Sequence, residues 1–302
     1  KKMTLIALFG GIESGLIYAL VALGVLISFR ILDFPDLTTD GSFPLGAAIF
    51  AVCVTNGINP WLACLAGAAG GAAAGMVTAW LHVSLKILQL LSSILVMVAL
   101  YSINLRVMDA PMIPLNGEPS VFSPFIAEDY SNQFWVQPLI ILGFVVVAKL
   151  LLDWFFSTEA GLSMRATGVN SRMARAQGVG TSKMIIIGMA LSNALVALGG
   201  ALFAQTQGSA DVASGIGTIV IGLAAVIIGE NLFPGKRMLV LTLSAIIGAL
   251  VYRLVITFAL GSEFLQSFGV RQTDLNLITA VLVVVALRLP YIKRYFKRKR
   301  SS

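Results

Sequence analysis

The chain has 302 residues, of which 58% are hydrophobic and only 12% are charged, and its formal net charge is +7. The mean hydropathy of +0.91 and the repeated apolar runs of about 20 residues are typical of a polytopic membrane protein and exclude an ordinary soluble domain. The two cysteines, Cys53 and Cys64, lie in apolar surroundings, so the sequence predicts neither a disulfide framework nor a cysteine-based metal site.

Eight apolar runs are long enough to cross a bilayer as helices. They are residues 3–29, 61–81, 92–108, 138–156, 184–204, 214–229, 238–260 and 273–289. The first run is too long for the apolar part of a signal peptide and lacks a small-residue cleavage site, so we interpret it as the first span. The expected fold is an all-α polytopic membrane protein of about eight transmembrane helices, in a single domain over residues 1–302.

Basic and acidic residues fall in different loops. The basic sites are Lys1, Lys2, Lys86, the stretch 165–183, the pair Lys236 and Arg237, and the tail 290–302. The acids gather in residues 33–40, 109–129, at Asp211 and in residues 263–274. The positive-inside rule predicts that the basic group is cytoplasmic and the acidic group external, with both termini in the cytoplasm. This split argues against nucleic acid as a partner, because juxtamembrane basic residues usually contact anionic membrane lipid.

The stretch 33–43, DFPDLTTDGSF, concentrates three aspartates in a chain that is poor in charge. The apolar piece that follows, residues 42–59, has only about 15 hydrophobic residues and is short for a full crossing. Pro35, Gly41 and Pro44 indicate a broken or re-entrant helix, and the charge pattern is kept only if this piece enters the membrane and returns. An ordinary polar loop, with Asp40 or Ser42 capping the next helix, is the alternative.

Polar residues inside the spans are candidates for a solute pathway. Glu13 lies near mid-membrane, where a carboxylate is costly unless it is paired, protonated or facing a cavity; a buried glutamic acid that joins two helices is the alternative. A small polar solute needs a few hydrogen-bonding groups in an apolar wall, with an acid to meet an ammonium group. The predicted pathway residues are Glu13, Thr38, Thr39, Asp40, Ser42, Ser92 and Asn104.

Neither catalytic nor metal-binding motifs stand out. The stretch nearest to a phosphate loop, residues 229–237 (GENLFPGKR), has the wrong glycine spacing and ends in Arg where Ser or Thr binds magnesium. We therefore expect no enzymatic activity and no metal site. Gly67, Gly71 and Gly75 repeat every four residues, which predicts a smooth helix face for either an internal contact or a dimer contact.

The long cytoplasmic loop, residues 158–183, reads TEAGLSMRATGVNSRMARAQGVGTSK. Four cations alternate there with glycines at 161, 168, 178 and 180, which predicts short helices separated by glycines. Such a segment is suited to docking into another protein, whereas a loop that only anchored to lipid would need the charges alone.

Within this loop, MRATGVNSRMARAQGV resembles the coupling region of ABC importer permeases of the branched-chain amino acid and ribose permease superfamily. The shared pattern is Arg-Ala-x-Gly-x-Asn, then Ala-Arg, then x-Gly-Val, and it is followed by LSNALVALGGAL and GIGTIVIGLAAVIIG. Two further stretches, ESGLIYALVALGVLISFRILDFPDLTTDGSFPLGAA and SSILVMVALYSINLRVM, are similar to a branch whose binding proteins are of the aromatic amino acid type. The resemblance covers the chain from Gly11 to about Leu289.

The resemblance implies a permease subunit of the bacterial inner membrane that imports a small polar solute, an amino acid, by alternating access. Its implied partners are ABC ATPase subunits that bind ATP and magnesium, a second permease copy in a homodimer, and an extracytoplasmic solute-binding protein. No cofactor is expected in this chain. The residues implied in coupling to the ATPase are Met164, Arg165, Gly168, Asn170, Arg172, Ala174, Arg175, Gly178 and Gly180.

Two alternatives stay open. The cations Arg165, Arg172 and Arg175 either pair with acids on the ATPase or anchor the loop to the membrane surface. The chain as a whole is alternatively a stand-alone ion-coupled secondary transporter or channel, in which Glu13 titrates. That alternative predicts transport by the chain alone in liposomes, driven by an ion gradient.

Overall fold

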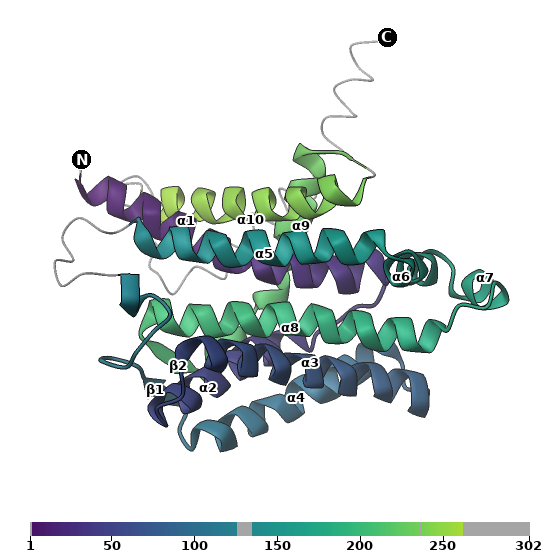
Figure 1. The fold of residues 1–302 in the computed structure, drawn as a ribbon, viewed down its shortest axis with the longest axis horizontal. Coiled ribbons are helices and arrows are strands. Elements are labelled where there is room, and N and C mark those ends of the chain that lie inside the picture. The colour runs from purple at the N-terminus through teal and green to yellow at the C-terminus, as the bar shows by residue number, and fades with distance from the viewer. Residues whose placement is uncertain (1, 126–134, 236, 262–302) are drawn as a thin grey trace, which may run out of the picture.

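A computed structural model describes residues 2–125, 135–235 and 237–261. This part of the chain is helical apart from one pair of short strands (Figure 1). The helices are α1 (Lys2–Val25), α2 (Thr39–Thr55), α3 (Pro60–Leu85), α4 (Gln89–Met108), α5 (Val136–Ser157), α6 (Glu159–Val169), α7 (Ser171–Ala176), α8 (Thr181–Gln207), α9 (Thr218–Leu232) and α10 (Met238–Gly261). A π-helical turn, η1 (Leu26–Ile31), continues α1, and two 3-10 turns are η2 (Ser123–Phe125) and η4 (Val212–Gly215).

Seven helical segments in the described residues are long and apolar enough to cross a membrane. They are Ala7–Ile31, Pro60–Leu85, Gln89–Met108, Val136–Ser157, Thr181–Gln207, Val212–Leu232 and Met238–Phe258. Seven of the eight predicted spans are therefore confirmed as helices. The eighth, residues 273–289, and the basic tail 290–302 lie outside the described residues.

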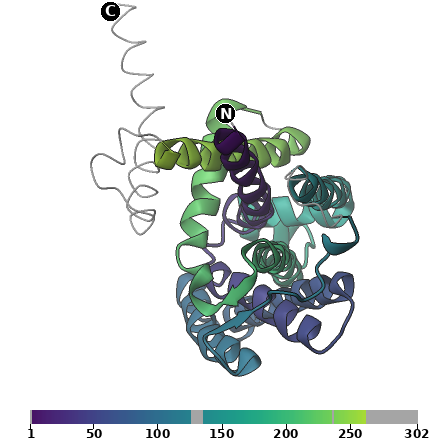
Figure 2. The same cartoon turned by 90° about the vertical axis from the view of Figure 1, so that its left-hand side faces the viewer.

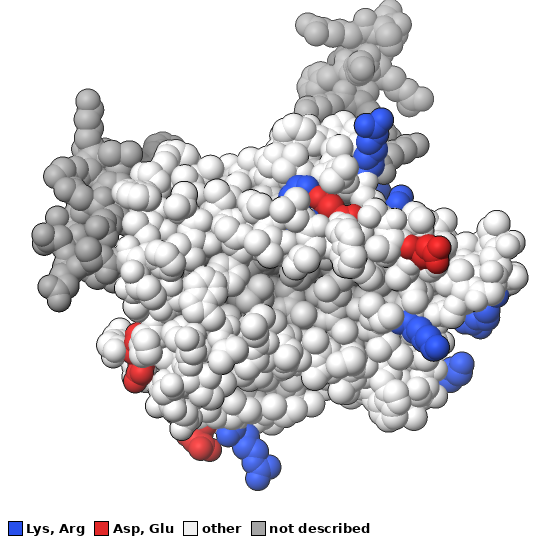
Figure 3. All heavy atoms as spheres, viewed as in Figure 1, with Lys and Arg blue, Asp and Glu red and all other residues white. Residues whose placement is uncertain are grey.

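The bundle has two distinct ends (Figure 1). The short helices α6 and α7 project from one end, which we call the α7 end. Strands β1 (Met112–Pro114) and β2 (Ser209–Asp211) pair antiparallel at the other, the strand end. Most of the visible Lys and Arg atoms lie toward the α7 end, and a broad band without charge separates them from the acids at the strand end (Figure 3). Within the described residues, the two predicted groups of loops thus lie at opposite ends, except for the N-terminus and the segment where α1 meets α2.

The first helix runs in the direction opposite to the prediction. Figure 1 shows α1 beginning at the strand end, and Gly11 packs there against Thr257, late in α10. At the other end of the helix, Arg30 Nε lies 2.6 Å from Glu230 Oε1, near the end of α9. The expectation that the N-terminus lies with the basic loops is wrong for this helix, and so is the assignment of Asp33 to the external acids. The two N-terminal lysines are outweighed by the larger number of cations in the later basic loops, so they do not fix the orientation of the first span.

The piece 42–59 crosses the bundle and does not return. Asp33 has a φ of +53°, and the residues after it run into the bundle without regular structure. Ser93 Oγ in α4 donates to Pro35 O at 3.4 Å, and α2 then begins at Thr39 and extends to the strand end, where α3 starts. A broken helix is confirmed, but its re-entrant form is wrong. With α1 reversed, a full crossing keeps residues 109–125, the described part of the acidic loop, and the basic 165–183 loop at opposite ends.

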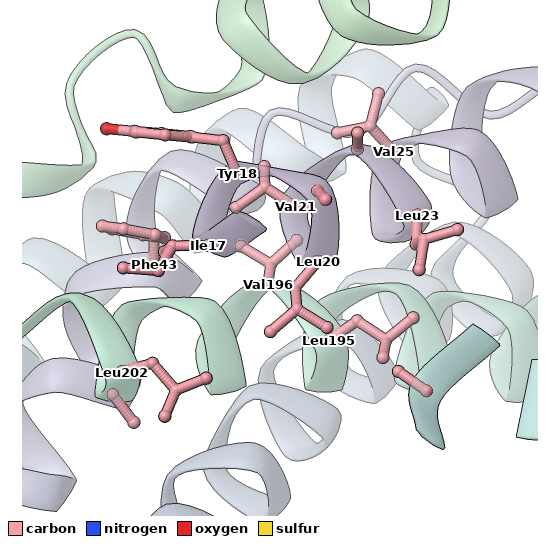
Figure 4. Packing of buried hydrophobic residues seen from close by; sticks show 14 of the residues in the cluster. Ile17, Tyr18, Leu20, Val21, Leu23, Val25, Phe43, Leu195, Val196 and Leu202 are labelled. Carbon is pink, nitrogen blue, oxygen red and sulfur yellow. The ribbon is translucent and has the colours of Figure 1, made fainter. Parts of the chain in front are cut away.

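Helices α1 and α8 form the centre of the bundle. Within the membrane-spanning segments, 78% of the residues are buried in α1 and 61% in α8. The corresponding share is 28% in both α4 and α5. Figure 2, which looks along the helices, shows α8 and α1 surrounded by the other helices. Figure 4 shows side chains such as Leu20 and Val21 of α1 directed toward Val196 of α8, beside the parallel rings of Tyr18 and Phe43.

Glycines let α2 and α3 approach α8 closely. A Cβ at Gly46 would overlap the carbonyl oxygen of Ala197, and a Cβ at Gly71 or Gly75 would overlap that of Asn193 or Met189. The smooth face of α3 is therefore an internal contact, because its glycines meet the backbone of α8 in the same chain.

Candidate solute pathway and coupling site

A buried polar cluster lies where the irregular segment enters the bundle. Asp36 is fully buried; its Oδ1 accepts the Thr38 N–H at 2.9 Å, and its Oδ2 accepts Asn193 Nδ2 at 2.8 Å. Asn193 Oδ1 accepts the Ser42 hydroxyl at 2.7 Å, and the hydroxyls of Thr38 and Thr78 lie 2.8 Å apart. We call these five residues the Asp36 cluster. It joins the break before α2 to α8 and α3.

The Asp36 cluster is internally satisfied. Among the described residues, no cation forms an ion pair with Asp36, so hydrogen bonds from Thr38 and Asn193 stabilise its carboxylate. The predicted pathway residues Thr38 and Ser42 belong to this cluster, and Thr39 Oγ1 donates to Asp36 O at 3.3 Å. All three side chains bond to protein and fix the broken helix in this structure.

Three members of the cluster, Asp36, Thr78 and Asn193, are absent from the predicted site. Asp36 was grouped with the external acids because it lies between two other aspartates. Asn193 is a single polar residue in a span, a pattern that is commonly a contact between helices. Neither pattern predicted that these residues, 157 positions apart, share a hydrogen bond.

A cavity of about 410 Å³ lies between α2, α4 and η4. It is lined by Asp40, Gly41, Pro44, Met97, Val98, Tyr101, Ser102, Asn104, Val212 and Ile216. Asp40 Oδ1 accepts the Ile219 N–H at 2.8 Å and its Oδ2 accepts the Gly217 N–H at 3.2 Å, so this carboxylate caps the N-terminus of α9. Asp40 is one of the predicted pathway residues. Besides lining the cavity, its carboxylate has a structural role, since it binds the first N–H groups of α9.

Asn104 also lines the α2–α4 cavity. Its Nδ2 donates to Gly41 O at 3.2 Å, and because a carbonyl only accepts, this bond identifies the other amide atom as the oxygen. That Oδ1 is buried and has no hydrogen-bond partner among the described residues. A buried acceptor without a donor costs about 1–3 kcal/mol. Asn104 is fully buried, so its unpaired oxygen lies behind the cavity wall and is not exposed in this conformation.

The chemistry of this cavity is one-sided. Its charged and amide groups, Asp40 and the Asn104 oxygen, are acceptors, and its walls are mainly apolar, including Met97 and Val98. No Lys or Arg is among the lining residues. Such a set suits an ammonium group attached to an apolar body, and the volume falls within the range of about 300–1,000 Å³ that is usual for small-molecule sites.

The structure does not bring the other two predicted pathway residues to this cavity. Glu13 is half-buried in α1 and has no hydrogen bond or ion pair to another described residue. Ser92 Oγ donates to Gln89 O of its own helix at 2.8 Å, and the neighbouring Ser93 reaches the broken segment. The predicted pathway residues thus separate into the Asp36 cluster, the α2–α4 cavity, and two isolated positions.

At the α7 end, the predicted short helices are present as α6 and α7. Asn170 ends α6 and caps α7, since its Oδ1 accepts the Met173 N–H at 3.0 Å, and Gly178, with a φ of +85°, forms the turn before α8. The expectation that every glycine separates two helices is wrong for Gly161 and Gly168, which lie inside α6. A Cβ at Gly168 would overlap the carbonyl oxygen of Ile31, so this glycine allows α6 to pack on the end of η1.

The residues of the predicted coupling region have distinct environments. Met164 and Ala174 are buried and anchor the two helices, whereas Val169 and Met173 are 89% and 63% exposed. Arg175 Nη2 donates to Thr181 Oγ1 at 3.2 Å and so holds α7 to the start of α8, which Gly180 precedes. Arg172 is exposed, and among the described residues it has no ion-pair partner.

Three charged side chains within the spans were not predicted as notable. Lys149 pairs with Asp153 one turn later in α5, and Asp153 Oδ1 accepts the Thr242 hydroxyl of α10 at 2.7 Å. Arg253 lies with its guanidinium carbon 5.3 Å from the centre of the Tyr18 ring. In each case a partner inside the protein offsets the cost of a charge at membrane depth.

The stretch 229–237 is not a nucleotide site. Gly229 lies inside α9, where a Cβ would overlap the carbonyl oxygen of Ser244, and Glu230 pairs with Arg30. The glycine that resembled part of a phosphate loop is a close contact between α9 and α10.

Residues 7–287 match the family described as branched-chain amino acid transport system / permease component. The chain belongs to this permease family. It is therefore a multi-pass membrane component of a bacterial ABC importer and is not itself an enzyme. ABC transporters use ATP through separate ATPase subunits, which agrees with the absence of a phosphate loop from the described residues. The alternative of a stand-alone ion-coupled transporter is not supported.

Curated relatives agree with this assignment. The permease is 42% identical over 273 residues to a tyrosine transport system permease protein of Clostridioides difficile, covering 90% of this chain and 87% of the relative. It is 24% identical over 289 residues to the ribose import permease protein RbsC of Escherichia coli K12, covering 93% of this chain and 84% of the relative.

Among solved structures, a metal-chelate type ABC transporter in an inward-facing conformation aligns with 96% of this chain and 85% of its own chain, at 16% identity and a TM-score of 0.48. The assignment rests on the family match and the curated relatives.

Proposed function

We propose that this permease imports an amino acid, working as a homodimer with two ATPase subunits and an extracytoplasmic solute-binding protein. The observation that carries the amino acid assignment is the α2–α4 cavity, in which the Asp40 carboxylate lies among mainly apolar walls, with the unpaired Asn104 oxygen buried behind them. The 42% identity to a tyrosine permease supports the same class of solute.

In this proposal, Asp40 accepts hydrogen bonds from the α-ammonium group, and Met97, Val98 and Tyr101 contact the side chain of the solute. Asn104 Oδ1, which is buried in this conformation, accepts a further hydrogen bond when the transport cycle opens the cavity. Asp40 already caps α9, so the ammonium and the N-terminus of α9 share one carboxylate. Solute binding and the position of α9 would then affect each other. Thr38, Thr39 and Ser42 hold the break before α2, and Glu13 and Ser92 are left out of the proposed site.

The same proposal gives α6 and α7 the role of docking on the ATPase. Val169 and Met173 supply exposed apolar contacts and Arg172 supplies an unpaired cation. Motion of α6 would reach the broken segment directly, because Gly168 packs on Ile31, and Met164 lies beside Leu32 and Gly188. Leu32 precedes Asp33 and Asp36, so a shift of the coupling helices changes the chain that leads to the cavity. This arrangement suits alternating access, in which ATP binding selects one of two orientations.

We expect Arg172→Glu to abolish retention of the ATPase subunit when the permease is purified in mild detergent from membranes that contain the whole transporter. The change reverses an exposed charge that has no ion-pair partner among the described residues, so the fold should be kept. Lys183→Glu is the matched control, because Lys183 is exposed at the start of α8 beyond the two coupling helices. Normal ATPase retention by the Arg172 variant would favour membrane anchoring as the role of this cation.

We expect Asn104→Leu to lower kcat/KM for ATP-driven tyrosine uptake in proteoliposomes by about tenfold or more, because a hydrogen bond to a charged group contributes about 1.5–3 kcal/mol. The basal ATPase rate should not change. Asn104→Asp keeps an acceptor at the same place and should retain most of the uptake. Equal uptake by the wild type and the Leu variant would remove Asn104 from the solute site, and absence of any ATP-driven amino acid uptake by the wild type would reject the proposed solute class.

A further inference from the structure

A second cavity, of about 580 Å³, opens at the α7 end. One wall is the turn between α3 and α4, with His82, Lys86 and Gln89, together with Asp33 after η1. The opposite wall is the coupling region, from Thr167 to Arg175, with Thr181 and Ser182 at the start of α8. The cavity therefore lies between the bundle and the helices proposed to dock on the ATPase. On the face shown in Figure 3, Lys and Arg atoms gather toward the α7 end.

Three cations line this cavity: Lys86, Arg172 and Arg175. Lys86 and Arg172 form no ion pair within the described residues, and Arg175 bonds only the neutral Thr181 hydroxyl. Asp33 is the one acid among the lining residues, so the cavity carries a formal excess of two positive charges. Like charges that line one cavity repel each other, and an anion between them removes that repulsion.

The bundle side of the cavity is held in place by local structure. Lys86 adopts a left-handed conformation with a φ of +59° and ends α3, where its N–H donates to Leu81 O. His82 Nδ1 lies 2.7 Å from Ile87 O, and because a carbonyl accepts, this nitrogen carries the proton. The His82 ring also packs edge-on against Phe34, with centroids 5.4 Å apart. The Lys86 wall is thus a fixed surface facing the coupling helices.

We propose that this cavity binds a phosphate-bearing anion that bridges Lys86 to Arg172 and Arg175 and so holds α7 against the α3–α4 turn. Guanidinium groups bind phosphate oxygens in pairs, and lysine binds them as a point charge. Because the two walls belong to the bundle and to the coupling region, the bound anion stabilises one position of α7 relative to the spans. This site is separate from the α2–α4 cavity and does not depend on the identity of the solute.

Phosphate chemistry has two sources here, a free anion and a phospholipid headgroup. The surroundings favour the headgroup, since Leu85, Leu88 and Leu91 beside Lys86 are 53%, 76% and 47% exposed and offer an apolar surface to acyl chains. Basic pockets between helices on the cytoplasmic side are a recognised setting for anionic lipid headgroups. A free phosphate would use the cations and leave these leucines without a role.

The test is the thermal unfolding midpoint of the full-length permease in nanodiscs, without ATPase or solute. Three conditions are compared: phosphatidylcholine with sodium chloride, phosphatidylcholine with inorganic phosphate at the same ionic strength, and phosphatidylcholine mixed with phosphatidylglycerol. We expect phosphatidylglycerol to raise the midpoint by about 2–4 °C. A rise with inorganic phosphate alone would assign the site to a free anion, and a rise in both conditions would show that either source fills it.

Substitutions distinguish anion binding in this cavity from a general attraction between the basic protein surface and anionic lipid. Lys86→Gln and Arg172→Gln should each remove the rise, whereas Lys183→Gln, an exposed cation at the same end that does not line the cavity, should keep it. If one of the first two variants does not fold, the other still decides the outcome. The proposal is overturned if the wild type shows no rise, or if the rise persists in both cavity variants. Because no ATPase is present, this result is independent of the proposed docking function.

Discussion

Three aspartates within eight residues occupy three different environments. Asp33 is exposed in the basic cavity at the α7 end, Asp36 is fully buried among hydrogen-bond donors, and Asp40 caps α9 while lining the α2–α4 cavity. The stretch carries charge because it passes from the α7 end into the interior of the bundle, and each carboxylate meets different groups on the way. Spacing alone predicted a polar segment; the depth of each aspartate depends on α8 and α9.

We expect Asp36→Ala to lower the free energy of unfolding of the detergent-solubilised permease by about 3 kcal/mol or more. The change removes two hydrogen bonds, each contributing about 0.5–1.5 kcal/mol, and leaves the buried Thr38 N–H without a partner, which costs about 1–3 kcal/mol more. Denaturant titration followed by tryptophan fluorescence measures the change.

Asp33→Asn is the control for Asp36→Ala, because Asn tolerates the left-handed backbone of residue 33 (φ +53°) and removes only the charge. Asp33 is exposed and has no ion pair within the described residues, so its substitution should change the free energy of unfolding by no more than about 0.5 kcal/mol. Equal effects of the two changes would contradict the assignment of Asp36 as the buried anchor of the broken segment.

At the scale of elements, α2 is held by backbone contacts that only glycine permits. Pro44 lies inside the helix and lacks the N–H that would bond Asp40 O, and Gly215 of η4 packs on that carbonyl. Further along α2, Gly46 meets Ala197 O of α8. The short helix is therefore fitted closely between η4 and α8. This explains why a segment of only 17 residues has a fixed place in the bundle.

We expect Gly46→Ala to destabilise the permease by about 1–3 kcal/mol, because the added Cβ would overlap a carbonyl oxygen of the α8 backbone and force the two helices apart. Gly143→Ala in α5 is the control, since a Cβ there meets nothing within 4 Å. Thermal unfolding in detergent compares the two variants with the wild type. A larger loss at Gly143 than at Gly46 would show that the α2–α8 contact is looser than described.

At the scale of the whole molecule, the direction of α1 decides how the chain crosses the membrane. With α1 running from the strand end to the α7 end, the broken segment and α2 together make one crossing in the opposite direction. The acidic loop after α4 then stays at the strand end, and the coupling helices stay at the α7 end (Figure 1).

Single cysteines test this arrangement in whole cells, after Cys53 and Cys64 have been replaced by alanine. We expect a membrane-impermeant thiol reagent to label Asn56→Cys, at the end of α2, and not Asp33→Cys. A re-entrant segment would place both positions outside, so labelling of both would restore the original topology. Val169→Cys, on the coupling helices, is the control that should be labelled only after the membrane is opened.

The sequence by itself determined the seven described spans, the two short helices at the α7 end, the absence of a phosphate loop and the permease family. These follow from hydropathy and from local motifs, which depend on neighbouring residues. The tertiary structure decided the direction of α1, the crossing by α2, the burial of Asp36 and the cavity around Asn104. Each of these depends on contacts between distant segments, such as Asp36 with Asn193 and Asp40 with Ile219. A carboxylate in a loop and a carboxylate inside a bundle have the same local sequence pattern, and only the groups that pack around them distinguish the two.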